Sequence, residues 1–136
     1  MQPRIDFGFG IKPEALALAH LVNVYLNGGP ELPKSWDFNA YAWYNGRERG
    51  VLLALVKDFD HVLYIVFGEN RSSDDLFVDS WTGKITLNPP TVADWPEEAY
   101  RGRRSFRYDC GHDAAAAIRL LIDDYIVANV GANDAQ

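Results

Sequence analysis

The sequence predicts an α+β fold, in which an antiparallel β-meander of about five strands packs against an N-terminal helix, a short helix and a long C-terminal helix. Three observations predict it. Residues 51–56 and 62–67 are continuously apolar over strand length. Asn45-Gly46 is a strong hairpin signal between strand-like segments. Helical periodicity marks both ends of the chain, so we expect a sheet flanked by helices.

The first helix is expected to begin near Pro13, since proline fits the first turn of a helix. Four apolar residues follow at the spacing i, i+3, i+4 and i+7, namely Leu18, Leu21, Val22 and Tyr25. The Gly-Gly-Pro run at 28–30 then ends the helix, because glycine and proline are typical of helix C-termini.

The strands are expected to follow one another as hairpins. Thr82-Gly83 is interpreted as the turn of the last hairpin, and the prolines at 89 and 90 end the sheet because they cannot continue a ladder. The segment before the C-terminal helix supplies one more brief strand. The expected strand segments are 38–44, 47–57, 61–67, 75–81, 84–87 and 104–108.

The two apolar runs do not alternate with polar residues, and strands of this kind are normally central and covered on both faces. The chain offers two good helices and a short one as cover. Either a helix lies on each face of the sheet, or a partner caps one face. A homodimer or a protein complex is therefore a possible outcome.

Two helices are expected after the hairpins. Asp94 and Glu97 have the spacing of a capping box, which starts the short helix. The C-terminal helix carries an apolar stripe, and we expect its charged side to face water. The stripe is Ile118, Leu121, Ile122 and Tyr125, and the charged side is Arg119, Asp123 and Asp124.

Length and composition restrict the function classes. The chain has 136 residues, which is the length of one domain, so we expect a single domain over 1–136 with a frayed tail at 130–136. The net charge of −6 disfavours nonspecific attraction to nucleic acids or anionic lipid. A single cysteine cannot form an intramolecular disulfide, and no segment reads as a signal or a membrane span, so a cytoplasmic protein is expected.

No cofactor or metal is expected. The three histidines, at 20, 61 and 112, are far apart in sequence, and the chain has no Cys-Cys or His-x-x-x-His pair at the spacing of metal ligands. A carboxylate site assembled by folding is the alternative, and no sequence feature points to it. The glycines of the segment 7–10, Phe-Gly-Phe-Gly, lack the strand before and the helix after that a phosphate-binding loop needs.

One candidate catalytic set centres on Cys110, which opens the last helix, where exposed N–H groups lower the pKa of a thiol. His61 is the candidate base and Asp79 the residue that orients it. The segments 61–68 (HVLYIVFG) and 109–112 (DCGH) resemble the histidine strand and the nucleophile helix of circularly permuted papain-like enzymes, including the lecithin:retinol acyltransferase-like group. The resemblance implies a cysteine hydrolase or acyltransferase. The alternative is that Cys110 packs inward with the helix stripe.

Two charged segments are the candidate partner-binding region. The segment 68–75 is interpreted as a polar loop between apolar strands, a location that commonly carries function. The segment 100–108 interleaves arginines with aromatic residues, and alternation along a strand would point Arg103 and Arg107 to one side and Arg104 to the other. The candidate residues are Glu69, Asn70, Arg71, Asp74, Asp75, Arg101, Arg103, Arg104 and Arg107.

Three functions are compatible with these features. The favoured hypothesis is a small acidic module without enzymatic activity, which binds a protein and inhibits or assists it, as an inhibitor, immunity or accessory factor does. This hypothesis accounts for the high aromatic content and for the segregated charges. The alternatives are the cysteine enzyme described above and a domain that binds a small ligand. Nucleic-acid binding is disfavoured by the acidic composition.

Overall fold

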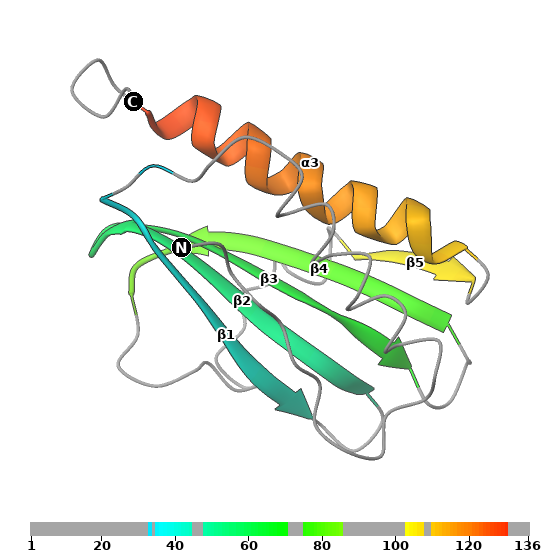
Figure 1. The fold of residues 1–136 in the computed structure, drawn as a ribbon. Helices are drawn as coiled ribbons and strands as arrows, with labels where there is room; N and C mark the ends of the chain where they lie inside the picture. Colours follow the sequence, from blue (N-terminus) through cyan, green and yellow to red (C-terminus); the bar gives the residue numbers. More distant parts are fainter. Residues whose placement is uncertain are drawn as a thin grey trace.

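In the computed structural model the described residues form a five-stranded antiparallel sheet with one long helix across it (Figure 1). The elements are β1 (Asp37–Tyr44), β2 (Glu48–Asp58), β3 (His61–Asn70), β4 (Asp75–Gly83), β5 (Arg104–Arg107) and α3 (Gly111–Asn129). The structure describes residues 33, 35–44, 48–70, 75–85, 103–107 and 110–130. The expected N-terminal helix and the expected short helix near Asp94 lie outside these residues.

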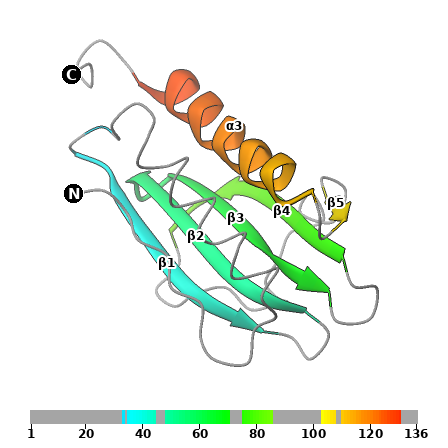
Figure 2. The same cartoon turned by 45° about the vertical axis from the view of Figure 1, so that its right-hand side comes forward.

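The strands are ordered β1-β2-β3-β4-β5, so each strand pairs with its neighbours in sequence (Figure 2). This arrangement confirms the predicted α+β class and the meander of about five strands. The two apolar runs pair with each other in β2 and β3, with Val51 opposite Phe67 and Val56 opposite Val62. β1 and β5 are the outermost strands of the sheet among the described residues.

Both faces of the central strands are buried, as the continuous apolar runs predicted. Alternate residues of each strand point to opposite faces, so the runs divide into two clusters. The cluster on the α3 side consists of Val51, Leu53, Leu55, Leu63, Ile65, Phe67, Leu76 and Val78, packed with Trp36 and with Ala114, Ala115, Ile118 and Ile122 of α3. The cluster on the opposite face consists of Leu52, Ala54, Val56, Val62, Tyr64, Val66, Phe77 and Trp81. The residues of both clusters are buried within the chain.

The predicted turn at Thr82-Gly83 is wrong. β4 continues through both residues, which pair with Leu63 and Val62 of β3. β3 is ten residues long. If β4 ended before Thr82, the backbone groups of Val62 and Leu63 that face β4 would lose their ladder partners. The chain leaves the strand at Lys84 and Ile85, and β4 pairs on its other side with β5 instead.

The interpretation of 68–75 as one long loop is also wrong. Gly68, Glu69 and Asn70 continue β3, and Asp75 is the first residue of β4. Only residues 71–74 connect the two strands. The polar residues at 69, 70 and 75 form ladder pairs, Glu69 with Leu76 and Asn70 with Asp75. Backbone pairing therefore extends past the end of the apolar pattern, which was the signal used to end the strand.

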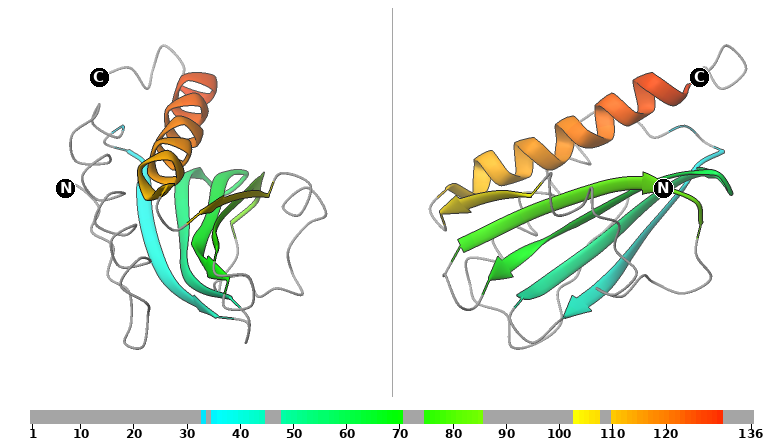
Figure 3. Two further views of the ribbon diagram at one scale, coloured as in Figure 1. Left: turned by 90° about the vertical axis from the view of Figure 1, so that its right-hand side faces the viewer. Right: turned by 180° about the vertical axis from the view of Figure 1, so that it is seen from behind.

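α3 lies over the sheet with one side against the strands, whereas its other side faces away from them (Figure 3). Small and branched residues line the inner side, and Leu121 and Tyr125 pack at its edge as the predicted stripe requires. Asp113 lies in the first turn, where a negative charge interacts favourably with the helix dipole and stabilises the helix. Arg119 and Asp123 form an ion pair at 2.8 Å on the flank of the helix.

Candidate functional site

The arginine segment folds as the edge of the sheet. Arg107 pairs with Asp75, and Arg104 pairs with Val78, so β5 runs antiparallel to the first half of β4. Arg104 and Phe106 share the α3 side of the sheet, since Phe106 packs against the α3-side cluster. Arg103 directly precedes the strand and reaches across the opposite face. The predicted separation of Arg103 from Arg104 is therefore seen in the structure.

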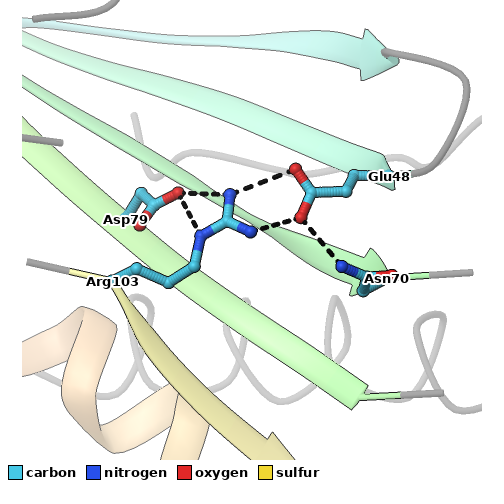
Figure 4. Close-up of polar contacts among 4 residues, drawn as sticks. All are labelled: Glu48, Asn70, Asp79 and Arg103. Carbon is cyan, nitrogen blue, oxygen red and sulfur yellow. Dashed lines mark hydrogen bonds and ion pairs between the residues drawn. The ribbon is translucent and has the colours of Figure 1, made fainter. Parts of the chain in front are cut away.

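The guanidinium of Arg103 bridges two carboxylates from different strands (Figure 4). Its Nε and Nη2 donate to Oδ2 of Asp79 on β4 at 2.8 and 2.6 Å. Its Nη2 also donates to Oε1 of Glu48 on β2 at 3.1 Å, and its Nη1 donates to Oε2 of the same residue. Nδ2 of Asn70 on β3 donates to Oε2 of Glu48 at 3.2 Å. We call Glu48, Asn70, Asp79 and Arg103 the ion cluster.

The ion cluster lies largely out of water. The side chain of Asp79 is 0% exposed, that of Glu48 is 7% exposed and that of Arg103 is 26% exposed. The guanidinium carbon of Arg103 lies 4.6 Å from the ring centroid of Phe77, so the cation also rests on an aromatic face. Two carboxylates and one guanidinium leave a formal charge of −1 in the cluster when both acids are ionised.

The two ends of the Arg103–Asp79 pair respond differently to burial. Burial raises the pKa of Asp79, and this effect outweighs the hydrogen bonds from Arg103 that lower it. Burial alone would lower the pKa of Arg103, but the hydrogen bonds to Glu48 and Asp79 raise it above its usual range. Oδ1 of Asp79 accepts no hydrogen bond within the described structure, which fits a carboxylate whose charge is incompletely compensated.

The raised pKa of Asp79 predicts how stability depends on pH. The folded protein holds this proton more tightly than the unfolded chain, so Asp79 contributes stability at low pH that is lost as the pH rises through its folded pKa. The asparagine of the variant Asp79→Asn cannot ionise, so the variant lacks this contribution to the pH dependence. We expect wild type to lose stability relative to Asp79→Asn as the pH rises from 4 to 8, measured by urea unfolding. The opposite slope would show that Arg103 lowers the pKa of Asp79 below its ordinary value.

The outer part of the site is exposed. Three of the four residues of β5, Arg104, Ser105 and Arg107, are exposed, and Phe106 is half-buried. The guanidinium carbon of Arg104 lies 5.1 Å from the ring centroid of Phe106, so the charge is held along the strand on the α3 side. β5 thus presents a positively charged edge on a chain whose net charge is −6.

The remaining partner-binding candidates are distributed unevenly. Glu69 is buried on the α3 side of the sheet and is not part of an exposed surface. Asn70 belongs to the ion cluster. Asp75 is half-buried opposite Arg107. Arg71, Asp74 and Arg101 lie outside the described residues. The structure therefore brings Arg103, Arg107, Asn70 and Asp75 together on the face opposite α3.

The three residues of the catalytic hypothesis are not brought together. His61 begins β3, and its Nδ1 lies 2.7 Å from Oδ1 of Asp58, an interaction that lowers the pKa of the Asp58 carboxyl. Cys110 caps α3 beyond Arg107, at the Asn70 end of β3, which is roughly 30 Å from His61 at 3.3 Å per residue. Asp79 binds Arg103. The cysteine enzyme gains no support from this geometry.

The described residues contain no group of three or more His, Cys, Asp or Glu side chains arranged to hold a metal ion. They also contain no helix with the length and apolar content needed to cross a membrane.

Sequence reasoning missed Glu48, which contributes two acceptor oxygens to the ion cluster. It follows the Asn-Gly turn signal in a charged Arg-Glu-Arg segment, and such a segment reads as a solvated strand end. Its sequence separation from Leu52 was a usable signal. Residues four apart on a strand share a face, and Leu52 belongs to a buried run, so Glu48 could be expected on the same buried face.

Comparison with known proteins finds no similar relative. No protein-family model matches the chain, and neither a curated protein nor a solved structure matches it.

Proposed function

We propose that this protein is a small interaction module without enzymatic activity, which binds a protein partner through the edge formed by β5 and thereby inhibits or assists that partner. The observation that carries the proposal is the exposure of Arg104, Ser105 and Arg107 on β5, which is an edge strand of the sheet formed by the described residues. An exposed edge strand offers backbone donors and acceptors to an added segment.

Two properties support this use of the edge. Arg104 and Arg107 lie on opposite faces of β5. Acidic side chains on either face of an added partner strand would therefore lie near a positive charge. The ion cluster fixes Arg103, the residue before β5, to β2 and β4. The edge is therefore held in one position before a partner arrives, which reduces the ordering cost of binding. A partner with acidic side chains at the contact fits this surface.

The test begins with a photoreactive amino acid at position 105, in the exposed strand, and a matched one at the exposed position 82 on β4. In the cells that naturally make this protein, we expect a protein to be captured at 105 and not at 82. The captured partner is then purified, and its Kd for wild type is compared with that for Arg104→Glu/Arg107→Glu. We expect the double charge reversal to weaken binding roughly 10- to 100-fold.

Two outcomes would reject the proposal. One is equal capture at positions 105 and 82, which would indicate random encounter. The other is an unchanged Kd for the double variant with the purified partner. Arg104 and Arg107 are exposed, so circular dichroism should show the double variant to be folded.

A further inference from the structure

The two arginines of β5 end two different rows of residues across the sheet. Arg104 ends a row that is apolar and buried on β4, β3 and β2, and its other members are Val78, Phe67 and Val51. Arg107 ends a row that contains two acids, and its other members are Asp75, Asn70 and Glu48. Within the sheet, therefore, an acid lies opposite Arg107, whereas a buried valine lies opposite Arg104.

On the α3 side of β5, a cation and an aromatic ring lie two residues apart. Arg104 is exposed and Phe106 is half-buried, and the guanidinium carbon of Arg104 lies 5.1 Å from the ring centroid of Phe106. Among the described strands, β5 pairs only with β4 (Figure 2). A strand that adds to the other edge of β5 would place every second side chain on this face, beside Arg104 and Phe106.

We infer that the β5 edge selects an extended partner segment with an acidic residue opposite Arg104 and a β-branched apolar residue opposite Phe106. The inference rests on the function proposed for this edge and specifies the segment that the edge binds. Every strand pair of the sheet is antiparallel, and antiparallel pairs are also the commoner kind. An antiparallel segment reads apolar, any residue, acidic from its N-terminal end. The position opposite Arg107 needs no acid, because Asp75 already lies opposite Arg107 within the sheet.

Two cross-strand contacts favour this pattern. Opposite charges and aromatic–β-branched pairs both stabilise a sheet when they lie directly opposite each other. The net charge of −6 would instead repel an acidic segment at long range. At about 0.15 M ionic strength, exposed charges more than about 8 Å apart are largely screened. Under these conditions the contact with Arg104, and not the net charge, decides which segment binds.

The experiment measures binding of fluorescent peptides to the full chain by fluorescence anisotropy at about 0.15 M salt. The first peptide has about eight residues, the length of an ordinary strand, and contains Val-Thr-Glu flanked by threonines. Its valine, threonine and glutamate can lie opposite Phe106, Ser105 and Arg104. The second peptide has lysine in place of the glutamate, and the third has the reversed order Glu-Thr-Val.

We expect wild type to bind the Val-Thr-Glu peptide about 5-fold more tightly than the lysine peptide, and more tightly than the reversed peptide. Arg104→Glu should invert the preference, so that the lysine peptide binds more tightly. Arg107→Glu is the matched control, because it makes the same charge change on the other face of β5. It should keep the preference for glutamate within about 2-fold of the wild-type ratio. Should Arg104→Glu fail to fold, as judged by circular dichroism, Arg104→Gln should abolish the preference.

Three results would overturn the inference. The first is that wild type binds none of the peptides, or binds the lysine or the reversed peptide at least as tightly as the Val-Thr-Glu peptide. The second is that Arg107→Glu inverts the preference as Arg104→Glu does, which would indicate a response to net charge. The third is that the glutamate preference survives in Arg104→Glu. Any of these results together with capture of a partner at position 105 rejects the sequence pattern alone, whereas failure of capture at 105 rejects the proposed edge itself.

Discussion

Arg103→Met is expected to lower the free energy of unfolding by about 3–5 kcal/mol, the largest loss we predict for a single side chain. Methionine keeps much of the volume against Phe77 but removes the cation that compensates Glu48 and Asp79. Both carboxylates would remain in a site that is closed to water. Urea or guanidinium unfolding at pH 7 measures the loss. A smaller loss at pH 5 is expected, because burial raises the pKa of Asp79 and protonation of Asp79 removes part of the uncompensated charge.

The control for this variant is the next residue. Arg104→Met removes the same charge from an exposed position and should change stability by no more than about 0.5 kcal/mol. Replacing the acids together with the arginine, as Glu48→Gln/Asp79→Asn/Arg103→Met, should recover part of the loss, since no buried charge then remains. If Arg103→Met and Arg104→Met were equally stable, the ion cluster would not contribute to the fold.

The sheet could be predicted from local patterns, because its strands follow one another in sequence. The apolar runs at 51–56 and 62–67 indicated central strands covered on both faces, and the structure confirms this. Strand alternation also separated Arg104 from Arg103 correctly. These features depend on neighbouring residues and on the two-residue period of a strand, which a single sequence displays directly.

The ion cluster could not be predicted in the same way. Glu48 and Arg103 are 55 residues apart, and neither position has a local pattern that points to the other. Their meeting depends on the register of three ladders, β2 with β3, β3 with β4 and β4 with β5. The predicted turn at Thr82-Gly83 placed the expected strand 84–87 beside β4, where the structure has β5. With that error, the position of Arg103 relative to Glu48 could not be predicted.

Gly50→Ala is expected to destabilise the protein by at least about 3 kcal/mol, because the new methyl group would meet backbone rather than a movable side chain. A Cβ at position 50 would lie 1.9 Å from the carbonyl oxygen of Phe67 and 2.8 Å from Cα of Gly68. β2 and β3 would have to separate at this pair, which also displaces Glu48, two residues away, from Arg103. Gly83→Ala is the matched control, since a Cβ there has no atom within 4 Å and stability should change by less than about 1 kcal/mol. Guanidinium unfolding of the two variants gives the comparison, and equal midpoints would show that the central strands can separate at Gly50 without loss.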